Sequence, residues 1–129
     1  MKPPDLAVVD ASGWHEWKGT TDTLRAGAQH ARLGFALIDL AKAKDKAALF
    51  GALDRALVLP EHFGHNWDAL ADVLEDRDWL GTRGRVVVLA HAAAYRKDHP
   101  NDWATLEETL GEAAEFWKER NVAFWVFVT

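Results

Sequence analysis

Short runs of apolar residues alternate along the chain with longer stretches in which apolar residues recur every three or four positions. The runs are nearly continuous, and they cover residues 35–40, 85–90 and 122–128. Such runs are typical of strands that are buried on both faces of a parallel sheet. The stretches between them have the period of amphipathic helices, over about residues 45–57 and 103–120 and from residue 67 onward. This alternation predicts an α/β fold in which a three-stranded parallel sheet is flanked by helices and joined by right-handed crossovers.

The first 34 residues follow this pattern less closely. The segment from Trp14 to Lys18 fits a strand, which would add a fourth strand to the sheet, or an arm lying over the core. Thr21 is the expected N-cap of a helix over about residues 22–32, and Gly34 is expected to close it. We therefore expect residues 1–34 to be an N-terminal extension, packed on the domain formed by residues 35–129. The sequence assigns this extension no function.

The remaining connections carry clear local signals. Asp45 is a good N-cap for the helix that runs to about residue 57. Residues 77–85 contain two glycines and predict a turn-rich connection, and residues 92–97 predict a short helix. A break is expected at residues 99–102, which contain a proline, before the long helix starts near Trp103.

The loop at residues 59–66 introduces the most distinctive helix of the chain. Pro60 has a fixed φ and biases the residue before it away from helix, so the preceding helix should end here. Gly64 can adopt the positive φ of a tight turn. Asn66 is a favourable N-cap, since its side-chain oxygen can accept a hydrogen bond from a free amide of the next turn.

From Trp67 onward, apolar and acidic residues separate onto opposite sides of one helix. The apolar side, which we expect to be buried, is formed by Trp67, Leu70, Val73 and Leu74. At about 100° per residue, the carboxylates cluster on nearly the opposite, exposed side, as Asp68, Asp72, Glu75 and Asp76. This acidic face is either a simple solvated surface or a binding surface for a basic partner.

Two catalytic or metal-binding interpretations compete with protein binding. His62, His65 and Asp68 are ligand types that zinc prefers, but His62 and His65 are expected before the helix begins, so helix geometry does not force the three side chains to converge on one ion. Asp68 and Asp72 could also form an acid and base pair. No phosphate-binding glycine loop or nucleophile elbow accompanies them, so we expect neither an enzyme nor a bound metal or cofactor.

The string from Pro60 to Asp72 resembles the barstar family of intracellular ribonuclease inhibitors. The matching positions are Pro60, Glu61, Phe63, Gly64, Asn66, Asp68, Ala69, Leu70 and Asp72. From about Leu33 to Thr129, the order of elements and the apolar pattern also agree with that family. The resemblance implies a barstar-like fold and a function as an inhibitor or immunity protein that blocks a bacterial ribonuclease or ribonuclease-like toxin.

The resemblance also implies roles for individual residues. Asp72 would enter the cationic pocket of the nuclease most deeply, Asp68 would pair at its edge, and His62 would pack against the nuclease surface. Gly64 and Asn66 would shape the loop. The chain departs from the prototype at His62, Ala71, Glu75 and Asp76, and it has Phe116 in place of a further acidic contact, with Glu112 and Glu115 close by. These departures leave the general mode of binding intact and leave the partner open, between a different ribonuclease and a toxin with a similarly basic cleft.

Composition agrees with an acidic protein that binds a basic one. The formal net charge is −5 and the pI is about 5.6, which argues against direct binding of nucleic acid. There is no cysteine, and no signal-like or membrane-spanning apolar run is present, so we expect a cytoplasmic protein that does not contact membranes. The alternative function is a non-inhibitory binding module of the same fold that docks another basic protein.

Overall fold

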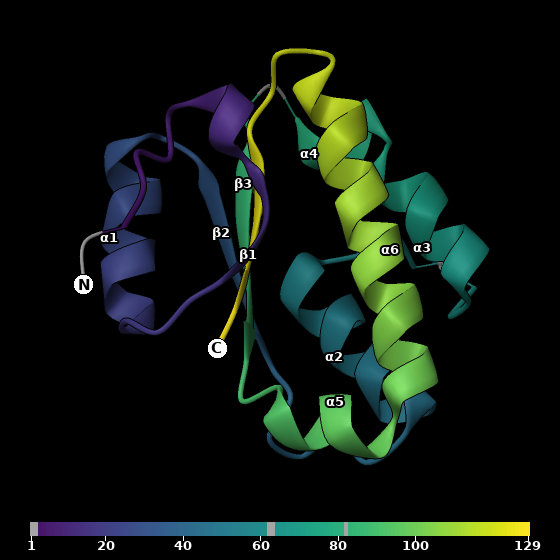
Figure 1. The fold of residues 1–129 in the computed structure, drawn as a ribbon. Coiled ribbons are helices and arrows are strands. Elements are labelled where there is room, and N and C mark those ends of the chain that lie inside the picture. The colour runs from purple at the N-terminus through teal and green to yellow at the C-terminus, as the bar shows by residue number, and fades with distance from the viewer. Residues whose placement is uncertain (1–2, 62–63, 82) are drawn as a thin grey trace.

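The computed structural model describes residues 3–61, 64–81 and 83–129. It contains a parallel sheet with helices on both faces (Figure 1), which confirms the predicted α/β architecture. In chain order the elements are η1 (Val9–Ala11), β1 (Gly13–Glu16), α1 (Thr21–His30), β2 (Gly34–Asp39), α2 (Lys46–Leu57), α3 (Trp67–Leu74), α4 (Arg77–Leu80), β3 (Arg85–Ala90), α5 (Ala93–Asp98), α6 (Pro100–Lys118) and β4 (Phe124–Val128).

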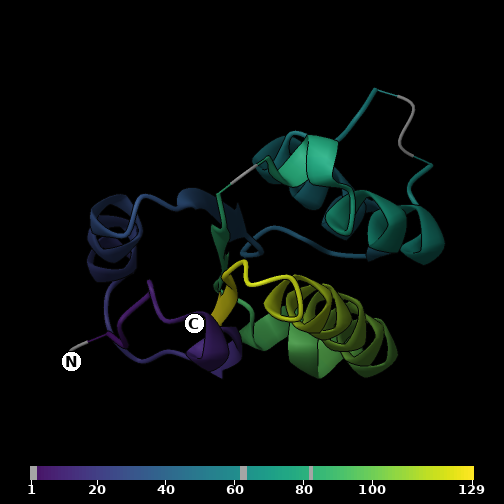
Figure 2. The ribbon, with the colours of Figure 1, turned by 90° about the horizontal axis from the view of Figure 1, so that it is seen from above.

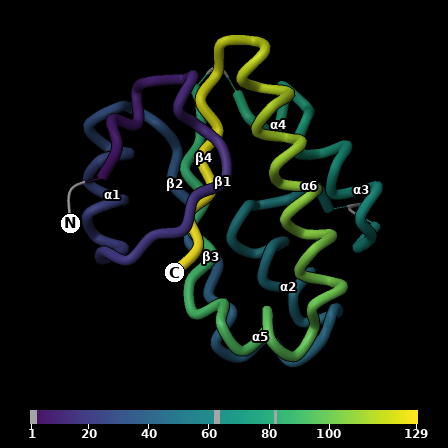
Figure 3. Tube along the Cα trace, in the orientation of Figure 1, coloured from purple at the N-terminus to yellow at the C-terminus, as the bar shows by residue number. Residues whose placement is uncertain are grey.

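The sheet has four strands in the order β1-β4-β3-β2, and every neighbouring pair is parallel. The segment around Trp14 is therefore a strand rather than an arm, and the fourth strand of the sheet is confirmed. Trp14 lies opposite Val126 in the register of β1 and β4. Figure 3 shows the last strand of the chain lying between β1 and β3, so segments from both ends of the sequence lie side by side.

Both faces of the sheet are buried. Val87 and Leu89 of β3 pack with residues of α2, α3 and α6, whereas Val86 and Val88 pack with α1 and the N-terminal segment. Figure 2 shows α1 and the N-terminal segment on one side of the sheet and the other helices on the opposite side. Because helices and the N-terminal segment cover both faces of the two central strands, all five residues of β4 and all but the first of β3 are buried, and these two strands have continuous rather than alternating apolar sequences. In the edge strand β2, only Ala36 and Ile38 are buried.

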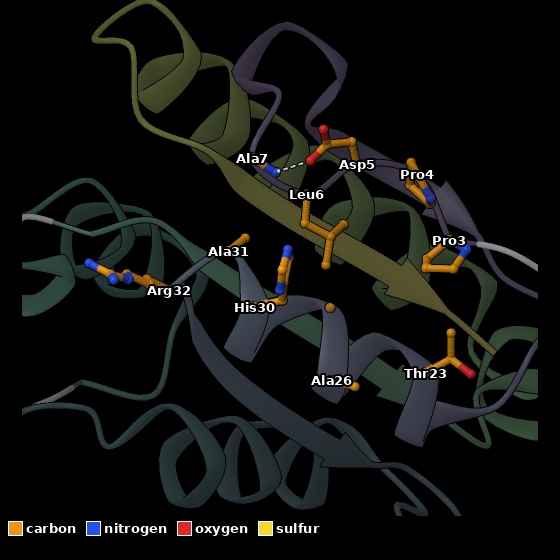
Figure 4. Close-up of a pocket in the computed structure, with 11 residues that line it drawn as sticks. Pro3, Pro4, Asp5, Leu6, Ala7, Thr23, Ala26, His30, Ala31 and Arg32 are labelled. Carbon is orange, nitrogen blue, oxygen red and sulfur yellow. Dashed lines mark hydrogen bonds between the residues drawn. The ribbon is translucent and has the colours of Figure 1, made fainter.

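The N-terminal segment is attached to α1 and to the last strand. Leu6 is buried, and its carbonyl oxygen accepts a 2.9 Å hydrogen bond from the Trp125 indole. A Cβ atom on Gly27 would lie 3.0 Å from a Leu6 methyl carbon, so the glycine in α1 permits this close approach. A hollow of about 850 Å³ lies between the segment and α1. Figure 4 shows the residues that line it, with the Asp5 carboxylate accepting a hydrogen bond from the amide of Ala7.

The ends of α1 differ by one or two residues from those expected. Thr20, rather than Thr21, is the N-cap, since its side chain accepts a hydrogen bond from the amide of Thr23. Arg32, with φ of 61°, rather than Gly34, takes the left-handed conformation after the helix, and Gly34 begins β2. The amide of the residue after Arg32 bonds back to Ala28 across this turn, which supports the strained φ of a non-glycine residue.

Two other expectations were wrong in detail. The turn-rich connection contains the short helix α4, which Asp76 caps through a 2.8 Å bond to the amide of Asp78. The long helix α6 begins at Pro100 instead of near Trp103. Proline is well suited to the first helical position, because the amide that it lacks has no partner there.

Candidate protein-binding site

The helix α3 begins where the sequence predicts. The backbone of Asn66 is extended, and its side-chain oxygen accepts a 2.8 Å hydrogen bond from the amide of Ala69. Leu70 and Leu74 are fully buried in the core that α3 shares with α6 and the sheet. The carbonyl of Leu74 also accepts a 2.7 Å bond from the buried indole of Trp117 on α6. The underside of α3 is therefore anchored by packing and by a hydrogen bond.

The expectation of full burial was wrong for Trp67 and Val73, which are only half-buried. Trp67 lies at the rim of the core, with its ring 4.8 Å from that of Phe50, and the Lys46 ammonium lies 5.9 Å from the Trp67 ring. The sequence period identifies the inner side of the helix, but it does not show where that side leaves the core. Trp67 consequently contributes an aromatic surface beside the acidic face.

The four carboxylates expected on the acidic face separate into two groups. Asp68 and Asp72 are exposed and lie one turn apart on α3, as predicted. Glu75 is half-buried at the C-terminal end of α3, and Asp76 has turned away to cap α4. The prediction continued the helical period past Leu74, where α3 ends, so it was wrong in placing Asp76 on the acidic face of α3. Its structural role is that of a capping residue.

Glu75 lies near other carboxylates at the junction of α3 and α6. Partial burial raises the pKa of its carboxyl above the usual value, and the Glu112 and Asp72 carboxylates raise it further. The Arg120 guanidinium acts in the opposite direction. Because Glu112 belongs to α6, this crowding results from the packing of α3 against α6 and is not visible in the sequence of α3 alone.

A shallow acidic groove of about 550 Å³ runs along α6 beside Glu75. Gly111 and Phe116 line it, and the Arg120 guanidinium lies 3.5 Å from the centroid of the Phe116 ring. The other lining residues are Glu107, Glu108, Glu112, Glu115 and Glu119. The sequence comparison with the barstar family drew attention only to Glu112 and Glu115. The full row could have been found from spacing, since residues 108, 112, 115 and 119 follow the period of one helical face.

We expect Glu75→Gln to stabilise the protein slightly at neutral pH. A carboxyl whose pKa is raised in the folded state holds its proton to a higher pH than in the unfolded chain. Stability should therefore fall as the pH rises above the ordinary value of 4.5, through the raised folded-state pKa. The gain from Gln at pH 7 should be below about 1 kcal/mol, because much of the carboxylate is solvated. Urea unfolding at pH 4 and pH 7 measures it, with Asp10→Asn as the matched control, and a loss of stability at pH 7 would contradict it.

The loop before α3 differs from the expected turn. His65, with φ of 48°, takes the left-handed conformation that was expected of Gly64. The His65 ring stacks near Phe50, and its Nε2 atom lies 3.3 Å from a carboxylate oxygen of Asp54 on α2. Gly64 accepts a hydrogen bond at its carbonyl from the Asn66 side chain, and a Cβ there would come within 3.0 Å of that amide nitrogen. His62 lies outside the described residues.

A metal site is another interpretation of these residues. Among residues 3–61, 64–81 and 83–129, no three His, Asp or Glu side chains converge on a point that could hold a metal ion. We expect protein purified without chelators to contain no stoichiometric metal, which elemental analysis would check. Finding one zinc ion per chain, with that ion absent from a His65→Ala variant, would contradict this expectation.

The fold and the site define an α/β protein with a parallel sheet and an exposed, carboxylate-bearing helix anchored on its longest helix. A family model described as Barstar (barnase inhibitor) matches residues 33–129, and the chain belongs to this family. A comparison with curated proteins finds no match. The members of this family are inhibitors rather than enzymes, and their partners are ribonucleases. The chain is therefore similar to a ribonuclease inhibitor. No helix among the described residues is long and apolar enough to cross a membrane.

Proposed function

We propose that this protein is an inhibitor or immunity protein that blocks the active site of a ribonuclease or ribonuclease-like toxin with α3. One observation supports this most directly. Asp68 and Asp72 are both exposed, one turn apart, on a helix whose other side is fixed in the core. A rigid helix presents its side chains without the entropic cost of ordering a flexible segment at the interface.

The chemistry of ribonuclease active sites suits such a helix. These enzymes bind the RNA phosphates with lysine, arginine and histidine. Side chains at positions i and i+4 have their Cβ atoms about 5–6 Å apart, so Asp68 and Asp72 can make neighbouring charge-assisted hydrogen bonds to such cations. We assign Asp72 to the centre of the interface and Asp68 to its edge.

The acidic groove along α6 extends this surface. Glu75 joins the two, since it lies at the end of α3 and lines the groove with Glu112 and its neighbours. Exposed charges at the rim of an interface mainly accelerate association with an oppositely charged partner. We therefore assign the α6 glutamates to electrostatic steering of a basic nuclease, with Phe116 as an apolar contact in the groove.

The loop residues complete the proposed interface. Asn66 and Gly64 fix the entry into α3 through the contacts described above, and His62 is assigned to the nuclease surface by the family pattern. Asp76 has a capping role and is proposed only as a distant contributor of charge. A role as an immunity protein would place the chain in the cytoplasm, where it would protect the cell from its own or a neighbour's nuclease.

The test is capture followed by an enzymatic assay. The whole immobilised protein is incubated with lysate and culture medium of the source organism, and ribonuclease activity is measured on the eluted fraction with and without added protein. The proposal expects a basic nuclease whose activity falls to background at equimolar inhibitor, and expects an Asp68→Ala/Asp72→Ala double variant to capture much less of it. Capture of a basic protein without nuclease activity would contradict inhibition and support the non-inhibitory binding module instead.

A further inference from the structure

Arg85 is a half-buried arginine without an acidic partner among the described residues. It begins β3, and none of the ion pairs found in the described part of the chain includes it. Its guanidinium stacks on the ring of Trp79, with 4.3 Å from the central carbon to the ring centroid. It makes one long hydrogen bond, of 3.5 Å, to the carbonyl of Leu57. Partial burial lowers its pKa, which is consistent with a charge that is poorly compensated.

The guanidinium lines a hollow of about 400 Å³ at one edge of the sheet. The other lining residues are Gly34, Phe35 and Ala36 of β2, Ala56, Leu57 and Val58 at the end of α2, and Trp79. Gly34 lies opposite Arg85 in the register of the two strands. A Cβ on Gly34 would lie 3.4 Å from the Arg85 Nε atom, so the glycine leaves the hollow open beside the guanidinium.

The same hollow borders the free edge of the sheet. The amides of Gly34 and Leu40 donate hydrogen bonds toward β3, to the carbonyls of Gly84 and Ala90. In a parallel ladder every second residue directs its amide and carbonyl to the same neighbouring strand. The amides and carbonyls of Phe35 and Leu37 therefore point away from the sheet, at an edge where β2 has no neighbouring strand. Leu37 is 37% exposed. Unpaired strand edges of this kind readily accept an additional strand.

An apolar residue at the mouth of the hollow adds to this edge. Val58 follows α2 in the left-handed conformation, with φ of 53°, and it is 79% exposed. The left-handed backbone is unfavourable for a β-branched residue, and the exposed side chain gains none of the free energy of apolar burial in the isolated protein. A partner side chain covering Val58 would supply that burial, and it would lie next to the Arg85 guanidinium.

We propose that the β2 edge and the Arg85 hollow form a docking site for an extended, acidic peptide segment of a partner protein. The segment would add to β2 as a further strand, through the outward amides and carbonyls of Phe35 and Leu37. A glutamate or aspartate on its α2-facing side would then place its carboxylate on the Arg85 guanidinium, in the two-point geometry that arginine offers. Strand addition supplies affinity, and the pocket supplies specificity.

This site is separate from the acidic helix and binds the opposite charge. Figure 1 shows α3 on the outer side of the helical layer and β2 within the sheet. A free phosphate would satisfy Arg85 but would leave the strand edge and Val58 unused. The combination of an arginine that has no acidic partner in the described part of the chain, an open strand edge and an exposed valine therefore favours an acidic peptide.

The test uses the whole protein and synthetic peptides. The probes are capped peptides of alternating valine and threonine, flanked by Gly-Ser pairs, with one glutamate moved through each position and a matched glutamine series. Amide chemical shifts report the binding site and affinity. The best glutamate peptide should shift the Phe35 and Leu37 amides and bind about tenfold tighter than its glutamine twin.

Variants separate the two parts of the site. Arg85→Gln should reduce the glutamate-to-glutamine affinity ratio to about one, whereas Arg83→Gln, with the same charge change at an exposed position, should leave it unchanged. Leu37→Pro removes an outward amide and the partly exposed leucine side chain but no hydrogen bond to β3, so it should abolish binding of both peptides while the sheet remains folded. If Arg85→Gln does not fold, Arg85→Lys should still lower the ratio, because lysine lacks the planar fork. Equal binding of the two series, or no shift at Phe35 and Leu37 with any peptide, would overturn the proposal.

Discussion

Replacing Asp72 by alanine should weaken binding of the captured nuclease by about 2–5 kcal/mol, which is a factor of roughly 30 to several thousand in Kd. The proposed interface places this carboxylate in a desolvated cationic pocket. Its removal would leave the partner's arginine or lysine groups buried without a hydrogen-bonding partner. Most of the loss should appear in the dissociation rate, because the remaining carboxylates still steer association.

Comparison with other variants makes this result specific. Asp68→Ala should cost less affinity than Asp72→Ala, and Asp10→Ala, exposed on η1, should cost nothing measurable. Glu75→Ala should change mainly the association rate and its dependence on salt, because long-range charge effects are screened within about 8 Å at physiological ionic strength. Association and dissociation rates measured at two salt concentrations test all four substitutions. If Asp72→Ala binds as tightly as the parent, α3 does not act as a phosphate mimic.

Truncating Leu70 to alanine should destabilise the folded protein by about 2–5 kcal/mol. Leu70 is completely buried on the underside of α3, where it belongs to the core that α3 shares with α6 and the sheet. The substitution removes apolar contacts and leaves a cavity that the anchored helices can fill only in part. Urea unfolding measures the change, and the dependence of the free energy on urea should stay the same.

The matched control lies two residues along the same helix. Asp72 is exposed, so Asp72→Ala should change stability by no more than about 0.5 kcal/mol, with a slight gain if it relieves repulsion from Asp68 and Glu75. Leu70→Ala should therefore lower the free energy of unfolding, whereas Asp72→Ala should lower the affinity for the nuclease. A loss below about 0.5 kcal/mol for Leu70→Ala would mean that the buried side of α3 has been misassigned.

Features set by neighbouring residues could be predicted from the sequence. The strand at residues 85–90 has the expected bounds, and Asp45 and Asn66 cap the helices that they were expected to cap. These signals depend on a continuous apolar run or on a side chain three residues from a free amide. They can therefore be recognised in the sequence without knowledge of the fold. The exposed positions of Asp68 and Asp72 follow in the same way from the helical period.

Features that depend on distant segments could not be predicted. The sequence left the segment at Trp14 open between a strand and an arm over the core, because β1 is short and weakly patterned and its partner β4 is more than 100 residues away. Trp67 remains half-exposed because the core ends beneath it, and Asp76 turns away because α3 stops at Leu74. The crowding of Glu75 by Glu112 arises only when α3 packs on α6. Each of these outcomes depends on tertiary packing rather than on local preference.

The central position of β4 also has a consequence for synthesis of the chain. Translation proceeds at about 5–20 residues per second, so roughly 5–20 s separate the appearance of β1 from that of β4. During this interval β1 and β3 lack the strand that joins them, and α3 is attached to a nascent chain without its completed core. An immunity protein of this design would begin to protect the cell only after residue 128 leaves the ribosome. In cells that make the nuclease and its inhibitor together, survival would then depend on synthesising the inhibitor ahead of its target.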